Sequence, residues 1–243
     1  MNRTYKLVLE YDGSDFHGWQ RQPGDRTVQA ELEAVLGRLF GGPVPVIGAG
    51  RTDTGVHALG QVASFRAEDK HPLETVQRAL NAMLPADIRV RSVETAEDGF
   101  NARRRASRRV YRYVLSRAPL AVGRQYAWHP RCRFDVDAMA AASECLKGLH
   151  RWTAFCKRDP EEDRYESEVH SVRWEAEADT VRFEITAVRF FHHMVRILIG
   201  TLVEVGKGAM TPADFRAVLE SGDREKAGPT APPNGLFLVR VEY

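Results

Sequence analysis

The sequence has little cysteine and no long apolar segment. Its three cysteines, Cys132, Cys145 and Cys156, are an odd number without Cys-x-x-Cys spacing, which argues against a disulfide framework and a zinc site. No long apolar run is free of charged residues, so we expect neither a signal peptide nor a membrane span. These absences predict a cytoplasmic protein whose cysteines are reduced structural thiols.

Neither sign of charge is in large excess. The 35 Lys and Arg residues and 33 Asp and Glu residues give a net charge of +2, too weak to indicate a nucleic-acid partner without a local cluster of basic residues. The 243 residues, 43% hydrophobic, are enough for one large domain or two small ones with a hydrophobic core.

The most distinctive segment is the glycine-rich stretch 48–58, which carries a single carboxylate, Asp53. A Walker loop needs Lys and then Ser or Thr after its second glycine, where this chain has Val56 and His57. A dinucleotide fingerprint beginning at Gly48 would need a glycine at the position of Asp53. Both failures disfavour a phosphate-binding enzyme of the nucleotide class.

Asp53 is a candidate catalytic carboxylate, although an aspartate between glycines is also a common turn residue. Arg51 and the hydroxyls of Thr52 and Thr54 could keep it ionised and oriented, as a nucleophile or base must be. The stretch has no second carboxylate, which disfavours a magnesium site. His57 is either an acid or base, or a residue that hydrogen-bonds the loop and holds its shape.

Hydrophobic periodicity predicts two halves with the same order of elements. In the first half we expect strands at 4–11, 44–47, 61–66 and 88–93, and helices at 27–39 and 72–84. In the second half we expect strands at 109–116, 169–177, 181–186 and 236–242, and helices at 136–149, 192–205 and from 211. The first order, β-α-β-β-α-β, is that of a ferredoxin-like unit. We predict an α+β fold with mainly antiparallel sheets and halves at 1–106 and 107–243.

The predicted helix 192–205 is apolar on nearly every side, as a buried helix would be. Arg196 fits there only if it pairs with a carboxylate, for which Asp53 is a candidate, or extends to the surface. His192 and His193 are adjacent and would point in different directions on a helix, which argues against a shared metal ion.

Several other side chains could contact a nucleic acid. Phe16, Trp19 and Arg21 lie in a loop that could contact a base, although loop aromatics also pack on the core. Tyr111 and Tyr113 share one face of a predicted strand, where either could pack in the core or stack on a base. The clearest electrostatic feature is an arginine cluster at Arg103, Arg104, Arg105, Arg108, Arg109 and Arg112.

Five motifs, in this order, carry a resemblance to a known family: EYDGS (10–14) with GWQRQ (18–22), GRTDTGVHA (50–58), RVYRY (109–113), FHHMVR (191–196) and APPNGL (231–236). In these segments, and nearly end to end, the sequence resembles the bacterial tRNA pseudouridine synthases of the A type. The resemblance implies two ferredoxin-like halves joined through an antiparallel sheet, with an active-site cleft between them. It implies that a homodimer without cofactor or metal converts uridines 38 to 40, in the anticodon arm of tRNA, to pseudouridine.

By position, Asp53 matches the catalytic aspartate of this family, Tyr111 the tyrosine that stacks on the target base, and Arg51 and Arg196 the arginines near the aspartate. The candidate substrate-binding residues are Arg103, Arg104, Arg105, Arg108, Arg109, Trp19, Arg21 and His57. One departure lies before Val169, where an Arg-Thr pair is expected. The acidic residues there, which put RNA contact by this loop in doubt, are Glu161, Glu162, Asp163, Glu166 and Glu168. The alternative function, a non-catalytic tRNA-binding or tRNA-folding module, would not need Asp53.

Overall fold

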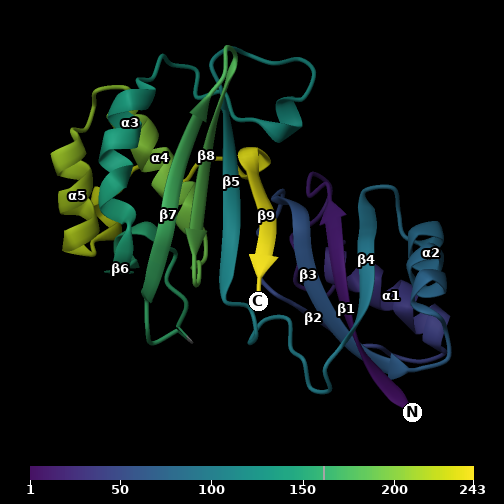
Figure 1. Cartoon of the computed structure of the whole chain (residues 1–243). Coiled ribbons are helices and arrows are strands. Elements are labelled where there is room, and N and C mark those ends of the chain that lie inside the picture. The colour runs from purple at the N-terminus through teal and green to yellow at the C-terminus, as the bar shows by residue number, and fades with distance from the viewer. Residues whose placement is uncertain (161) are drawn as a thin grey trace. The chain divides into compact units, whose positions relative to one another are not determined.

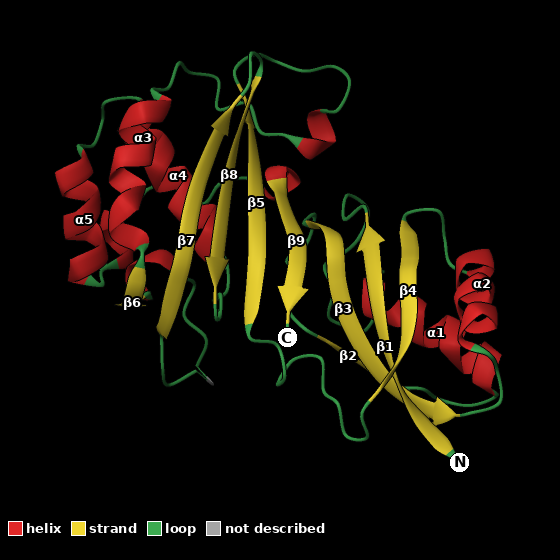
Figure 2. Cartoon of the chain, in the orientation of Figure 1, coloured by secondary structure: helices red, strands yellow, loops and turns green. Residues whose placement is uncertain are grey.

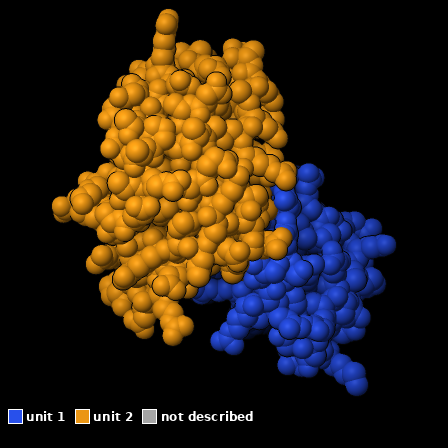
Figure 3. Space-filling model, turned by 60° about the vertical axis from the view of Figure 1, so that its left-hand side comes forward, with its two compact units in different colours: residues 1–107, 237–243 blue, residues 108–236 orange. Residues whose placement is uncertain are grey.

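A computed structural model describes residues 1–160 and 162–243, so Glu161 of the acidic loop lies outside the described residues. The chain forms two compact units, coloured separately in Figure 3. Unit 1 comprises residues 1–107 and 237–243, and unit 2 comprises residues 108–236. The predicted α+β class and the mainly antiparallel strand pairing are confirmed. The functional division at 106/107 stays a prediction.

Unit 1 has the predicted β-α-β-β-α-β order (Figure 1). Its elements are β1 (Asn2–Tyr11), α1 (Val28–Phe40), β2 (Val46–Gly48), β3 (His57–Glu68), α2 (Leu73–Met83) and β4 (Ile88–Ala96). Strand β1 pairs antiparallel with β4 and β3, and β2 pairs antiparallel with β3. Helix α1 lies one residue from the predicted 27–39. It is capped at both ends, because the Thr27 side chain accepts from the Ala30 N–H and Gly41 adopts a left-handed conformation with φ of 78°.

Strand β3 begins four residues earlier than the predicted 61–66, at His57. Its first residues pair in parallel with the last strand of the chain, β9 (Leu236–Glu242), in the register His57–Phe237 and Ala58–Leu238. The partner lies far along the chain, so periodicity within the loop could not reveal this part of the strand. The strand therefore starts directly after the Asp53 loop and holds its C-terminal end.

The described residues of unit 2 form the antiparallel strands β5 to β8 and the α-helices α3 to α5 (Figure 2). Its main elements are β5 (Arg108–Ser116), α3 (Val136–Ser143), β6 (Gly148–Arg151), β7 (Glu166–Ala176), β8 (Thr180–Ala187), α4 (Met194–Gly206) and α5 (Pro212–Ser221). The strand order is β5-β8-β7-β6. Helices α3 and α4 contact strands of this sheet, and α5 packs against both helices. No helix in the described ranges is long and apolar enough to cross a membrane.

Two predicted helices of unit 2 have wrong boundaries. The helix expected at 136–149 ends at Ser143, and a 3-10 turn then leads to β6. Gly148 has a φ of 100°, which no α-helix allows, and its strand gains hydrogen bonds from β7. The helix expected from His192 begins at Met194, because His193 adopts a left-handed φ of 62°. Both breaks depend on backbone conformations that hydrophobic periodicity does not encode.

Candidate active site

The backbone of the Asp53 loop is held on both sides by the aromatic loop that follows β1. The Trp19 N–H donates to the Thr52 carbonyl at 3.1 Å, and the Gly55 N–H donates to the Phe16 carbonyl at 3.2 Å. These two bonds enclose Asp53, whose own side chain is half-buried. The carboxylate is therefore carried by a segment whose backbone polar groups are anchored, as a precisely positioned group requires.

Glycines allow these two loops to approach each other closely. Gly18 has a φ of 84°, and a Cβ atom there would lie 2.6 Å from the Thr52 carbonyl oxygen. A Cβ atom on Gly48 would lie 2.5 Å from the Trp19 ring. Contacts this short do not occur for real Cβ atoms, so both positions require glycine. The glycines thus serve backbone packing around Asp53.

Two buried polar side chains, Tyr11 and Gln61, are hydrogen-bonded to residues of the Asp53 loop. The Tyr11 hydroxyl lies 2.8 Å from Thr52 Oγ1, and Gln61 Nε2 donates to the Gly50 carbonyl at 2.9 Å and to the Tyr11 hydroxyl at 3.4 Å. The Thr52 hydroxyl therefore bonds to Tyr11 and not, as the sequence suggested, to the carboxylate of Asp53. Burial raises the pKa of Tyr11 to about 12, which keeps its hydroxyl protonated.

Replacing Tyr11 with phenylalanine is expected to lower the free energy of unfolding by about 1 to 3 kcal/mol at pH 8, because the buried Thr52 hydroxyl and Gln61 amide lose a partner. The raised pKa adds a pH dependence. Between pH 10 and 12 only the unfolded wild-type chain loses this proton, so unfolding becomes easier as the pH rises. Urea unfolding at pH 8 and pH 11 should show a smaller alkaline loss in Tyr11→Phe. Equal alkaline losses in both proteins would contradict this assignment.

His57 is also part of the support for the loop. Its side chain is buried, its Nδ1 accepts from the Gly13 N–H at 3.0 Å, and its ring stacks on Phe237 with centroids 4.8 Å apart. This placement favours the alternative in which His57 holds the shape of the loop. Its role toward a substrate stays a prediction.

The two candidates from the aromatic loop have different surroundings. Trp19 is only 2% exposed and packs against Gly48, which favours core packing over contact with a base. Arg21 is exposed, and its guanidinium pairs with Glu33 on α1 at 3.3 Å. Arg51 is exposed within the Asp53 loop. Of these side chains, Arg21 and Arg51 offer surface to a ligand.

In unit 2 the two tyrosines of β5 have distinct roles. The Tyr113 hydroxyl donates to the Pro232 carbonyl at 2.7 Å, and burial raises the Tyr113 pKa well above its usual value, with the nearby Arg196 charge acting in the opposite direction. Tyr111 is 7% exposed, and its ring meets Phe190 edge-on with centroids 4.8 Å apart. The Tyr113 hydroxyl is thus hydrogen-bonded to the backbone, whereas the Tyr111 ring packs against Phe190. The two tyrosines share one face of the strand, so the sequence pattern could not distinguish them.

Arg196 is anchored at the start of α4, where nearly all its neighbours on the helix are buried. Its Nε donates to the Ala231 carbonyl at 2.8 Å, and the Ala231 N–H donates to the Arg196 carbonyl at 3.0 Å. This double contact joins α4 to the segment before β9 and orients the half-buried guanidinium. A pairing of Arg196 with Asp53 stays a prediction.

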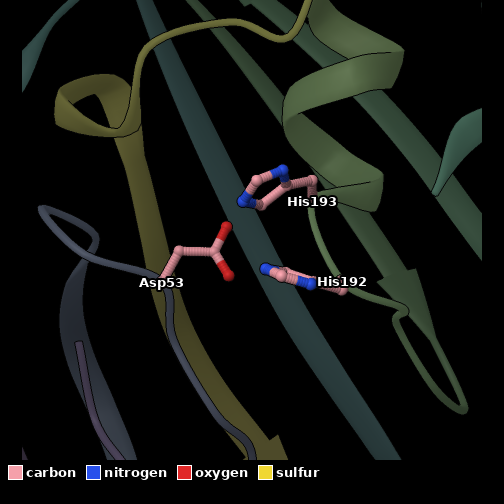
Figure 4. A group of neighbouring side chains, drawn as sticks. All are labelled: Asp53, His192 and His193. Atoms are coloured by element: carbon pink, nitrogen blue, oxygen red, sulfur yellow. The ribbon is translucent and has the colours of Figure 1, made fainter. Parts of the chain in front are cut away.

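His192 and His193 lie together, contrary to the sequence argument that they diverge on a helix. Their ring centroids are 4.1 Å apart, because both residues precede the first turn of α4 and His193 has a left-handed backbone. Figure 4 draws these two rings, and also the Asp53 carboxylate on its loop. The premise that the two imidazoles point in different directions is therefore wrong, while the expectation that they share no metal ion stays a prediction.

Two members of the arginine cluster pair with carboxylates. Arg105 pairs with Glu97, and Arg112 pairs with Glu184 at 3.1 Å. Arg109 is half-buried and donates to the Val188 carbonyl at 2.8 Å. The exposed members of the cluster are Arg103, Arg104, Arg105 and Arg108. The turn carrying Arg103 and Arg104 is shaped by Asn101, whose Oδ1 accepts both backbone N–H groups at 3.0 Å.

Comparison with known proteins gives full-length matches. A family model described as tRNA pseudouridine synthase matches residues 7–103 and 142–243. A tRNA pseudouridine synthase A of Moorella thermoacetica is 45% identical over 243 residues, 98% of this chain and 98% of that protein. Proteins of the same name from an Exiguobacterium species and Bacillus subtilis are 43% and 42% identical, covering 99% and 98% of this chain and 98% of each relative. Residues of both units take part in the family match.

Proposed function

Because this chain belongs to the tRNA pseudouridine synthase family and therefore isomerises uridine in tRNA to pseudouridine, we propose that Asp53 is the carboxylate that carries the reaction. The N-glycosidic bond between uracil N1 and the ribose breaks, the uracil turns, and a carbon-carbon bond forms from C5 to the ribose. N1 gains a proton and C5 loses one, so no other reactant is needed. One anionic group can serve by adding to the base or sugar, or by removing a sugar proton.

The observation that carries this proposal is the anchoring of the Asp53 loop. The backbone is held on one side of the carboxylate by Trp19, whose N–H donates to the Thr52 carbonyl, and on the other by Phe16, whose carbonyl accepts from the Gly55 N–H. The Tyr11 hydroxyl is also hydrogen-bonded to Thr52 Oγ1. Such rigid support is expected where one group must meet a reacting atom within a fraction of an ångström. A turn aspartate would need no support of this kind.

We further propose roles for three residues around the reaction. Tyr111 would stack on the extruded target base, a contact worth about 1 to 3 kcal/mol. Arg51 and Arg196 would supply the positive charge that keeps Asp53 ionised once water is excluded. For Arg196, the bond from Nε to the Ala231 carbonyl supports this role, because it orients the guanidinium without neutralising its charge.

The proposed substrate region is the anticodon arm of tRNA, with uridines 38 to 40 as the targets. The exposed arginines Arg103, Arg104, Arg105 and Arg108 would contact its phosphates, and Arg109 and Arg21 are further candidates for phosphate contact. Phosphate contacts of this kind position an RNA by shape and make binding depend on salt. We also propose that the enzyme acts in the cytoplasm as a homodimer.

Incubation with an unmodified tRNA transcript, followed by mapping of pseudouridine at each position, tests the proposed target. We expect pseudouridine at positions 38 to 40 wherever the transcript has uridine there. A transcript whose uridines at these positions are replaced by cytidine serves as the control and should remain unmodified. Pseudouridine at other positions would contradict the anticodon-arm assignment.

A further inference from the structure

Unit 2 contains a basic cavity of about 390 Å³ beside the start of α4. It is lined by side chains from three separate segments, among them Lys157, Arg158, His193, Arg224, Cys156 and Thr230. Three of these carry a permanent positive charge at neutral pH, and none is a carboxylate. The cavity therefore has the composition of an anion site.

Arg224 is held in place by oxygen atoms that carry no full charge. Its Nη1 donates to the carbonyls of Ala227 and Gly228 at 3.3 and 3.1 Å, and its Nη2 donates to Thr230 Oγ1 at 3.4 Å. Within residues 1–160 and 162–243, no ion pair joins a carboxylate to Lys157, Arg158 or Arg224. The guanidinium is thus oriented, and its charge is left for a ligand.

The segment of residues 156–158, which lines one side of the cavity, is hydrogen-bonded to the segment that precedes α4. The Lys157 N–H donates to the His192 carbonyl at 2.9 Å, and the next residue, His193, has the left-handed φ of 62°. A non-glycine residue in this conformation is uncommon and often marks a functional position. The cavity is therefore built on the same turn that leads to Arg196.

The protonation of Cys156 and the pairing of Glu162 are also compatible with a bound anion. Burial raises the pKa of the Cys156 thiol to about 11, so the thiol is neutral at physiological pH. Glu162, whose negative charge also raises the pKa of this thiol, pairs with Arg189. Neither group would place an unpaired negative charge against a bound phosphate.

We propose that this cavity binds a backbone phosphate of the tRNA next to the target uridine. Guanidinium and ammonium groups converging from separate segments are the usual donors to phosphate oxygens. An enzyme that extrudes a base must also hold the backbone beside the extruded nucleotide. The inference rests on the proposed function, because the cavity shares a turn with Arg196.

The test uses the variant Lys157→Ala/Arg158→Ala in an Asp53→Asn background, so that binding is measured without turnover. Both side chains are exposed, so their removal should leave the fold intact. For an unmodified tRNA transcript, we expect about tenfold weaker binding. We also expect the slope of log K against log salt concentration to fall in magnitude by about 1 to 2. The charge-matched control is Lys226→Ala/Arg173→Ala, which removes two exposed positive charges outside the cavity and should leave the slope unchanged.

An unchanged salt slope in the cavity variant, or an equal loss in the control, would overturn this proposal. Titration with inorganic phosphate distinguishes a free anion from the RNA backbone. Phosphate binding that depends on Lys157 and Arg158 without any change in tRNA binding would assign the cavity to a free anion and reject the proposal. The outcome is separate from catalysis. Full activity of Asp53→Asn would reject Asp53 as the catalytic group, and the salt slopes would then be measured with the transcript that has cytidine at positions 38 to 40, which cannot turn over.

Discussion

Replacing Asp53 with asparagine is expected to lower the rate of pseudouridine formation by at least about 10³-fold while leaving tRNA binding nearly unchanged. Asparagine has almost the same shape, so the loop held by Trp19 and Phe16 should keep its conformation. Its neutral amide, however, can neither add to an electrophilic carbon nor remove a proton. Single-turnover assays with unmodified tRNA, together with an equilibrium binding measurement, separate the two effects.

The matched control is Asp98→Asn, which removes a carboxylate of the same size from unit 1. The Asp98 side chain is 80% exposed, and its distance to Arg66 of 3.5 Å is that of a surface ion pair, which contributes little to stability. This variant should retain the wild-type rate. If Asp53→Asn also retained that rate, the carboxylate would have no chemical role.

Gly200→Ala is expected to destabilise unit 2 by about 3 kcal/mol or more. Gly200 lies in the middle of α4, where a Cβ atom would be 1.7 Å from the Pro229 carbonyl oxygen. That oxygen belongs to the backbone and cannot rotate away, so the helix and the segment 228–231 must separate. The same segment provides the Ala231 carbonyl that anchors Arg196, so activity should fall with stability. Urea unfolding of the purified variant measures the loss.

Gly37→Ala in α1 is the matched control, since it is the same change inside another helix. The nearest atom to a Cβ atom at Gly37 is the Gly42 carbonyl oxygen at 3.4 Å, an ordinary contact. This substitution should be neutral or stabilising by up to about 1 kcal/mol, because alanine favours helix more than glycine does. A Gly200→Ala protein as stable as the wild type would contradict the close packing of α4.

The sequence by itself determined most of the elements, their order in unit 1 and many of their ends. Helix α1 lies one residue from the predicted 27–39, α5 begins directly after residue 211, and β9 has the predicted bounds. These features follow from periodicity and capping. Both depend on residues that are close together in the sequence, so a short segment is enough to predict them. The motif around Asp53 was recognisable for the same reason, because its residues are contiguous.

Only the tertiary structure decided which partners these residues have. Strand β3 begins at His57 because β9 pairs with it, and the Thr52 hydroxyl bonds to Tyr11. The left-handed turn at His193 brings two imidazoles together, and the Tyr113 hydroxyl donates to the Pro232 carbonyl. Each outcome depends on a backbone angle that periodicity does not encode or on atoms distant along the chain. The contiguous motif therefore identified the Asp53 loop, whereas long-range packing decided how that loop is held.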